Sequence, residues 1–365
     1  MGKTTFCGEE LEAAIKRLPQ GKPQIDAYLN AIRQADEAGD PYWRLMFRCD
    51  YCYEATFRDD PPKAIPVAAE FCALFEENSA TFIERSPDGA SEMHLMIMQM
   101  GIDPIVFLPQ IPMKQWETMM AEFYRWVKYY HIGLRTYWWQ MARFWRYVDR
   151  KKAYEYFQKF WKTGRDGLSD CRTCERSYAV QMELLMGNRA AADEYAKPME
   201  QGRMRFCPDT PHLYWVAYLE DALDRGDLRE AEKRANALYR KGNRDKSDLS
   251  YIGAVLRCWA YTDPERALDL FAKRLEWSIG LWDQKKVYDF DKGACVCFRQ
   301  LSKHQQEVHL DLPRAFPLWR GDGAYNTKEL TSWFREQAET ISRCFDERNG
   351  SHCFGHDLAV ALAKR

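Results

Sequence analysis

The clearest periodic pattern of apolar and polar positions covers residues 208–242. Apolar side chains recur there every three or four positions, which places them on one face of an α-helix. The dipeptide Gly226-Asp227 interrupts this pattern, so two helices are predicted, and Thr210 or Asp209 is expected to cap the first. Two amphipathic helices separated by so short a break predict an antiparallel helical hairpin.

This hairpin pattern recurs along the chain. A small residue follows each predicted turn, and these residues are Ala64, Ala153, Ala192, Ala231 and Ala267. The interval is 39 residues from Ala153 to Ala192 and again from Ala192 to Ala231, and a period of this size is typical of stacked helical hairpins. Turns are predicted near Gly187, Gly226 and Asp263. Small side chains after the turns would let the paired helices approach closely.

Two local features resemble a known family. Trp215 matches the large residue early in the first helix of a tetratricopeptide repeat (TPR), and the segment from Gly226 to Ala231 matches its turn and the start of its second helix. Residues 137–277 are thereby similar to bacterial-type TPR-like α-solenoid proteins. The resemblance implies an all-α fold, a right-handed superhelical array of antiparallel helical hairpins. The repeat is longer than the usual 34 residues, and Leu219 stands where the family has a small residue.

The pattern also predicts how the chain is organised. Residues 1–303 are expected to form the TPR-like array, which follows the repeat less closely towards the N-terminus. Residues 304–327 contain prolines and glycines without helical periodicity and are predicted to form an irregular loop. Residues 328–365 are expected to form capping helices, because apolar positions recur at helical spacing through Leu330, Phe334, Ile341 and Phe345.

Composition narrows the classes of partner. The 53 basic and 54 acidic residues leave a net charge of −1, which does not favour nucleic acid or anionic lipid. No run of 18 apolar residues is present, so no membrane partner is expected. Twelve cysteines without an export signal indicate reduced thiols and a cytoplasmic protein. Nothing in the sequence indicates an oligomeric state.

Aromatic residues are concentrated between positions 116 and 161. Seventeen of these 46 residues are Phe, Trp or Tyr, against 14% in the whole chain, and arginines and lysines are interspersed among them. A TPR-like register places Arg135, Trp138, Ala142, Trp145 and Arg146 on the inner, concave side. Aromatic walls with two guanidinium groups would suit an acidic peptide or a C-terminal carboxylate. The alternatives are a packed core with arginines stacked on rings and, less favoured by the neutral charge, a single-stranded nucleic acid site.

Four side chains could form a metal site. Cys171 and Cys174 have the spacing of a zinc-binding pair, and Cys207 and His212 follow in the next repeat. Both groups stand near the start of a first helix, so the repeat places them on the same edge of the array. A structural zinc ion is therefore predicted at this edge. The alternative is four reduced side chains that share no ligand.

Two classes of function stay open. Motifs typical of serine hydrolases, nucleotide-binding loops and zinc proteases are absent from the sequence, so no catalytic residue is predicted. The first hypothesis is a scaffold or adaptor that binds a protein or an acidic peptide on the concave aromatic and basic surface. The second is an enzyme on an all-α scaffold, such as an α/α barrel, that acts on a small or carbohydrate-like substrate.

Overall fold

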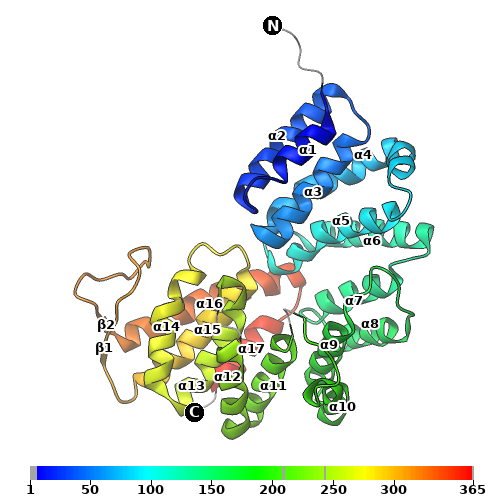
Figure 1. Cartoon of the computed structure of the whole chain (residues 1–365). Helices are drawn as coiled ribbons and strands as arrows, with labels where there is room; N and C mark the ends of the chain where they lie inside the picture. Colours follow the sequence, from blue (N-terminus) through cyan, green and yellow to red (C-terminus); the bar gives the residue numbers. More distant parts are fainter. Residues whose placement is uncertain (1–5, 208–209, 242–243, 364–365) are drawn as a thin grey trace. The chain divides into compact units, whose positions relative to one another are not determined.

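The chain folds almost entirely into helices. The computed structural model describes residues 6–207, 210–241 and 244–363. Within these ranges it contains seventeen α-helices, three short 3₁₀ helices and one two-stranded sheet (Figure 1). The prediction of an all-α fold is confirmed. Asp209, one of the two candidate caps, lies outside the described residues. No helix of the described ranges is both long enough and apolar enough to span a bilayer.

The helices divide between two compact units. Unit 1 comprises residues 1–140 and 159–169, and unit 2 comprises residues 141–158 and 170–365. Unit 1 contains α1 (Gly8–Ile15), α2 (Lys22–Ala38), α3 (Trp43–Arg58), η1 (Pro61–Lys63), α4 (Ala64–Arg85), α5 (Ala90–Ile102), η2 (Asp103–Phe107) and α6 (Met113–Tyr130). The helices α7 (Leu134–Trp145) and α8 (Arg150–Lys162) contribute residues to both units.

Unit 1 is built around aromatic side chains. Successive helices from α2 to α6 pack on one another, and Phe71, Phe75 and Phe82 of α4 are fully buried between them. The imidazole of His94 on α5 stacks on Phe75, with ring centroids 4.0 Å apart, and meets Trp126 of α6 edge-on. A buried aromatic cluster of this kind excludes water from a histidine that the sequence pattern did not single out.

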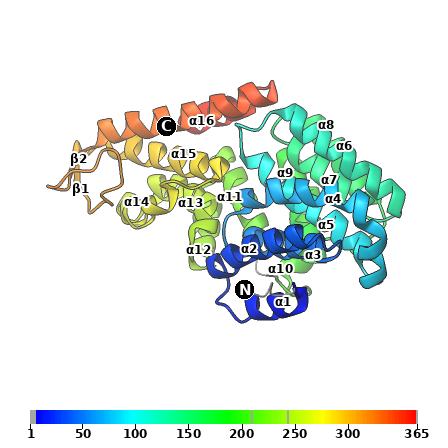
Figure 2. The same cartoon turned by 90° about the horizontal axis from the view of Figure 1, so that it is seen from above.

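Unit 2 carries the repeated hairpins. Its elements are α9 (Arg172–Leu185), α10 (Arg189–Glu200), α11 (His212–Arg225), α12 (Leu228–Lys241), η3 (Lys246–Asp248), α13 (Leu249–Thr262), α14 (Pro264–Ser278), α15 (Gln284–Leu301), β1 (Glu307–His309), β2 (Ala324–Asn326), α16 (Thr327–Asn349) and α17 (Cys353–Ala363). Helix α9 contacts α10 and α11, α11 contacts α12 and α13, and α13 contacts α14 and α15. Figure 2 shows α16 lying along α15, and the two helices pack on each other.

The predicted turns are confirmed. Gly187 and Gly226 have positive φ angles of 76° and 77° at the ends of α9 and α11, a conformation that glycine adopts without steric cost. Asp263 caps α14 by accepting a hydrogen bond from the N–H of Arg266. The alanines that follow these turns, Ala192, Ala231 and Ala267, are completely buried. Small side chains therefore do occupy the contacts between paired helices.

Residues 304–327, predicted as an irregular loop, contain two short strands. Strands β1 and β2 pair antiparallel, with Val308 opposite Tyr325, and both side chains are buried. The connecting segment buries Phe316, whose ring stacks on Phe334 of α16 with centroids 6.0 Å apart. The segment is therefore a β-hairpin that packs on α16. Three-residue strands are too short for their alternation to stand out in the sequence.

The two ends of unit 2 touch each other. The side-chain amide of Asn349, at the end of α16, donates to the carbonyl oxygen of Tyr147 at 3.1 Å, and the Ser351 hydroxyl donates to the same oxygen at 3.3 Å. The ring of Phe354 on α17 stacks on that of Tyr147, with centroids 5.4 Å apart. The last two helices therefore contact the segment that follows α7, so the beginning and the end of unit 2 are joined.

Candidate functional site

Three cysteines of unit 2 converge. The sulfur atoms of Cys171, Cys174 and Cys207 all lie within 4.8 Å of one another. Cys171 precedes α9, and its sulfur accepts a hydrogen bond from the N–H of Cys174 one turn later. Cys207 comes from the segment before α11, and its sulfur is 3.1 Å from that of Cys174. The predicted convergence of these three side chains is thus present.

Hydrogen bonds hold the segment of Cys207 against α9. The Thr173 hydroxyl in the first turn of α9 donates to the carbonyl oxygen of Arg205 at 2.8 Å. The N–H of Cys207 donates to the hydroxyl oxygen of Thr210 at 2.9 Å. Thr210 was expected to cap α11, but Pro211 occupies the N-cap position and no side chain caps this helix. The hydroxyl of Thr210 instead fixes the backbone that carries a cysteine of the cluster.

The chemistry of the cluster fits a thiophilic cation. Burial raises the pKa of the Cys174 thiol, and hydrogen bonding to the sulfurs of Cys207 and Cys171 raises it further. A thiolate at Cys174 would need a nearby positive charge, because two other sulfur atoms lie beside it. A metal ion supplies that charge and stabilises all three thiolates together. The residues present could therefore hold a metal ion.

His212 is not part of this group. It is the first residue of α11 and is buried, and its ring stacks on Tyr251 with centroids 5.5 Å apart. Its Nε2 atom is buried and has no hydrogen-bond partner among the described residues. Of the four predicted metal ligands, the structure brings the three cysteines together and places the histidine outside the set.

The predicted binding face on α7 includes enclosed positions. In unit 1, Arg135 is only 5% exposed, and its guanidinium donates to the carbonyl oxygens of Phe160 and Thr163 at the end of α8. This arginine satisfies carbonyls that a helix end leaves without partners. Trp138 is partly exposed, and the Lys159 ammonium lies 4.7 Å from its ring centroid. Arg135 therefore holds α8 and does not face an open surface.

The remaining predicted residues belong to unit 2. Ala142 is completely buried, whereas Trp145 and Arg146 are partly exposed. The ammonium of Lys152 lies 3.3 Å from the ring centroid of Trp145. Arg146 donates to the side-chain oxygen of Gln181 on α9 at 3.0 Å. Arg146 lines a cavity of unit 2.

That cavity encloses about 250 Å³ within unit 2. Helices α9, α11, α15 and α17 and the connection between α7 and α8 contribute to its wall. Two arginines line it at this place: Arg146 directly follows α7, and Arg150 is the first residue of α8. In the described part of the chain no ion pair joins a carboxylate to either guanidinium. Arg146 is bound to a neutral amide, and Arg150 is exposed. Both are therefore available to an anionic group.

A buried ionic trio forms another part of the wall. The Lys292 ammonium lies 2.7 Å from a carboxylate oxygen of Asp357, and the Tyr288 hydroxyl donates to the same oxygen at 2.8 Å. Burial would raise the pKa of Asp357, but the cations Lys292 and Arg257 hold it well below its usual range. Burial and the Asp357 charge raise the pKa of Tyr288. The trio is therefore a carboxylate, an ammonium and a neutral phenol that satisfy one another.

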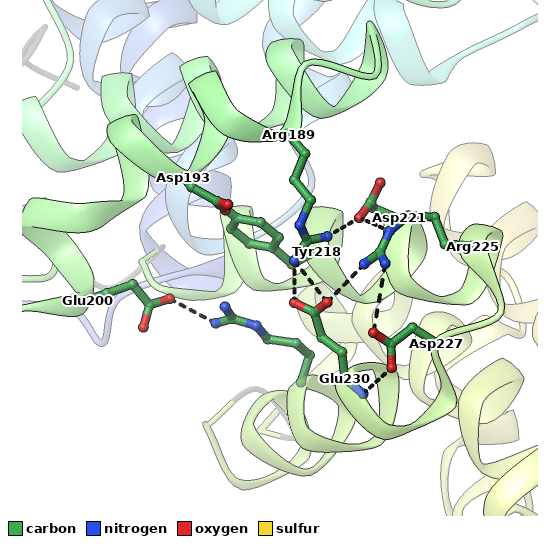
Figure 3. A network of polar contacts seen from close by, with 9 residues as sticks. Arg189, Asp193, Glu200, Tyr218, Asp221, Arg225, Asp227 and Glu230 are labelled. Atoms are coloured by element: carbon green, nitrogen blue, oxygen red, sulfur yellow. Dashed lines mark hydrogen bonds and ion pairs between the residues drawn. The ribbon is translucent and has the colours of Figure 1, made fainter.

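Helix α11 presents a row of carboxylates to the cavity, namely Glu220, Asp221 and Asp224. Arg257 of α13 faces this row, 3.5 Å from Glu220 and 3.8 Å from Asp224. Asp221 is turned to a different set of cations: Figure 3 shows it bound by Arg189 and Arg225. Neither Glu220 nor Asp224 has a cation closer than 3.5 Å among these ion pairs.

The network around Arg189 holds this wall in place. Arg189 opens α10 and pairs with Asp221 of α11 and, at 2.6 Å, with Glu230 of α12 (Figure 3). The Tyr218 hydroxyl of α11 donates to Asp193 of α10 at 2.6 Å. These contacts tie one hairpin to the next. The i, i+4 spacing of Tyr288 and Lys292 in the predicted helix could have suggested a shared face, but nothing in the pattern identified Asp357 as their partner.

The chain matches no protein-family model, no curated protein and no solved structure. The function is therefore argued from the residues of the cavity and of the cysteine cluster.

Proposed function

We propose that this protein is a scaffold or adaptor that binds a protein or peptide, built as a TPR-like right-handed superhelical array of hairpins. The regular alternation of turns and buried alanines in α9 to α14 supports this proposal. The first helices of two hairpins, α9 and α11, both line the cavity of unit 2. In TPR-like arrays the first helices form the inner surface that receives ligands, which is the role that the resemblance implies for these helices.

The partner presents a carboxylate group. The single observation that carries this proposal is the pair of arginines on the cavity wall, Arg146 and Arg150, which no described carboxylate neutralises. A guanidinium binds a carboxylate through two parallel hydrogen bonds, so it is the side chain best suited to an acidic or C-terminal group. Asp357, Lys292 and Tyr288 of the cavity are bonded to one another, which favours binding over catalysis.

Binding to an immobilised library of short peptides tests this function. Peptides that carry a free carboxylate should bind the wild-type protein and lose affinity for the Arg146→Gln/Arg150→Gln variant. Binding should also weaken with added salt, because charged contacts at an open site are screened. The exposed Arg240 of α12 lies outside the cavity, so Arg240→Gln is the matched control. A library in which no peptide binds would contradict the proposal.

The metal of the cysteine cluster is proposed to be a structural zinc ion. Cys171, Cys174 and Cys207 supply three thiolates, a ligand type that zinc prefers. When bound, zinc would link the start of α9 to the segment before α11 and so join two successive hairpins. The same proposal places the protein in the reducing cytoplasm, and it is supported by the free state of all twelve cysteines.

A further inference from the structure

We infer that the cavity of unit 2 receives the C-terminal residue of a partner peptide, and that this residue is a lysine or an arginine. The inference rests on the proposed function of this unit as a peptide-binding module. It adds the chemistry of the one residue that enters: a terminal carboxylate and a cationic side chain.

The closure of unit 2 favours a chain end over a continuous segment. Tyr147 and Phe354 both line the cavity and stack on each other, and Asn349 and Ser351 hold the Tyr147 carbonyl oxygen. A peptide that ran through the site would have to separate this contact. A chain end can enter without doing so, and about 250 Å³ is room for the end of a chain only.

The arginines place the carboxylate. Arg146 directly follows α7 and Arg150 is the first residue of α8, four positions later, and both line the cavity. Lys285 and Lys292 also line it, but Asp289 lies 2.6 Å from the first and Asp357 lies 2.7 Å from the second. The terminal carboxylate is therefore expected at the two arginines, which no carboxylate of the described residues neutralises.

The acidic row of α11 places the cationic side chain. Glu220 has a side chain that is 43% exposed, and its nearest cations, Arg257 and Lys292, are 3.5 Å and 3.9 Å away. These separations leave room for a closer ammonium or guanidinium. Val216 and Ala217 line the cavity on the same helix and can cover the aliphatic part of a lysine or arginine side chain.

The charge balance of the cavity wall supports a ligand that carries one positive and one negative group. Four cations line the cavity, namely Arg146, Arg150, Lys285 and Lys292, and four carboxylates do so, namely Glu220, Asp221, Asp224 and Asp357. A purely anionic ligand would meet repulsion from the acidic row. A terminal residue that carries both charges meets an opposite charge at each end.

Fluorescence anisotropy with three labelled peptides tests the inference. The probe is an amino-terminally labelled Gly-Ser-Gly-Ala-Lys with a free carboxylate. One comparison peptide has an amidated C-terminus, and the other has norleucine in place of lysine. Each change should weaken binding about tenfold or more, because each leaves a charged group of the cavity without its partner.

Two variants assign each half of the ligand to its partner. Arg150→Gln, at an exposed position, should remove the preference for the free carboxylate over the amide and keep the preference for lysine. Glu220→Gln should remove the preference for lysine over norleucine and keep the preference for the free carboxylate over the amide. Arg240→Gln should bind all three peptides as the wild type does. Equal affinity for carboxylate and amide, or for lysine and norleucine, overturns the inference. The proposed function would still hold after such a result if peptides from the library bind the protein and lose affinity for the Arg146→Gln/Arg150→Gln variant. A library in which no peptide binds would contradict both the inference and the proposed function.

Discussion

The backbones of Gly253 on α13 and Gly293 on α15 touch where the two helices cross. A Cβ atom on Gly293 would lie 2.4 Å from the carbonyl oxygen of Gly253, and one on Gly253 would lie 2.3 Å from the carbonyl oxygen of Asp289. Side chains normally keep packed helices about 8–10 Å apart, so this crossing depends on two glycines. It also places Lys292, the neighbour of Gly293, where it lines the cavity.

Gly293→Ala should destabilise unit 2 by about 1–3 kcal/mol or more, because the added methyl group meets a backbone atom that cannot move aside. Urea unfolding followed by circular dichroism measures the change. Gly321→Ala is the control, since the nearest atom to its added Cβ would be 3.6 Å away, an ordinary contact. Equal stability of Gly293→Ala and wild type would show that α13 and α15 do not cross here.

Ala231→Leu should destabilise the protein by about 1–3 kcal/mol, because Ala231 is completely buried between α11 and α12 and a larger side chain would overpack that contact. The free energy of unfolding in urea is the measurement. Ala190→Leu on α10 is the matched control, since Ala190 is exposed. A neutral Ala231→Leu would mean that the hairpin does not pack through this face.

The protein purified without a metal-chelating tag should contain about one zinc ion per chain by elemental analysis. Cys171→Ser should lose the metal and unfold at a lower temperature, because zinc binds the folded but not the unfolded chain. Zinc affinity should decrease as the pH is lowered, because protons compete with the metal for the thiolates. Cys344→Ser, at an exposed cysteine of α16, should keep both properties.

Two results would contradict the zinc prediction. One is protein without zinc in which all thiols react with a thiol reagent. The other is a count of two fewer reactive thiols, which would mean that Cys174 and Cys207 form a disulfide. Their sulfurs lie 3.1 Å apart, farther than the about 2.05 Å of a disulfide and nearer than the about 3.8 Å expected for two ligands on one zinc ion.

His94 should make the stability of unit 1 depend on pH. Burial lowers its pKa from 6.5 to about 3, so below pH 6.5 the unfolded chain takes up a proton that the folded one does not. The contribution of the neutral imidazole is complete above pH 6.5 and is lost as the pH falls towards 3, by at most about 1.4 kcal/mol per pH unit.

Comparison with His94→Phe isolates this effect. The variant keeps an aromatic ring against Phe75, and its stability relative to wild type should rise as the pH falls from 7 to 4. The comparison cancels the pH dependence that other titratable groups contribute to stability. One of these is Asp50, whose pKa is raised to about 6 by burial and whose contribution to stability grows as the pH falls. Urea unfolding at several pH values measures the difference, and a constant difference would contradict the assignment.

The sequence by itself determined the helices and turns of unit 2 and which cysteines could meet. Turns at Gly187 and Gly226 and buried alanines such as Ala231 follow from spacings within a few residues, where backbone geometry is local. The repeat extended this reasoning across longer distances. Cys207 could be placed beside Cys171 and Cys174 because equivalent positions of successive hairpins recur on the same edge.

Only the tertiary structure decided the contacts between residues that the sequence repeat does not connect. Arg135 was expected on an open face, but its guanidinium binds carbonyls at the end of α8. His212 was expected beside the cysteines, but its ring stacks on Tyr251. The hydrogen bond that joins the two ends of unit 2 runs from Asn349 to Tyr147, and the glycines of α13 and α15 meet at a crossing outside the repeat. These pairings depend on how helices distant in sequence fold back on one another. Helical spacing reports which face of a helix is apolar and carries no information on which distant helix that face will meet.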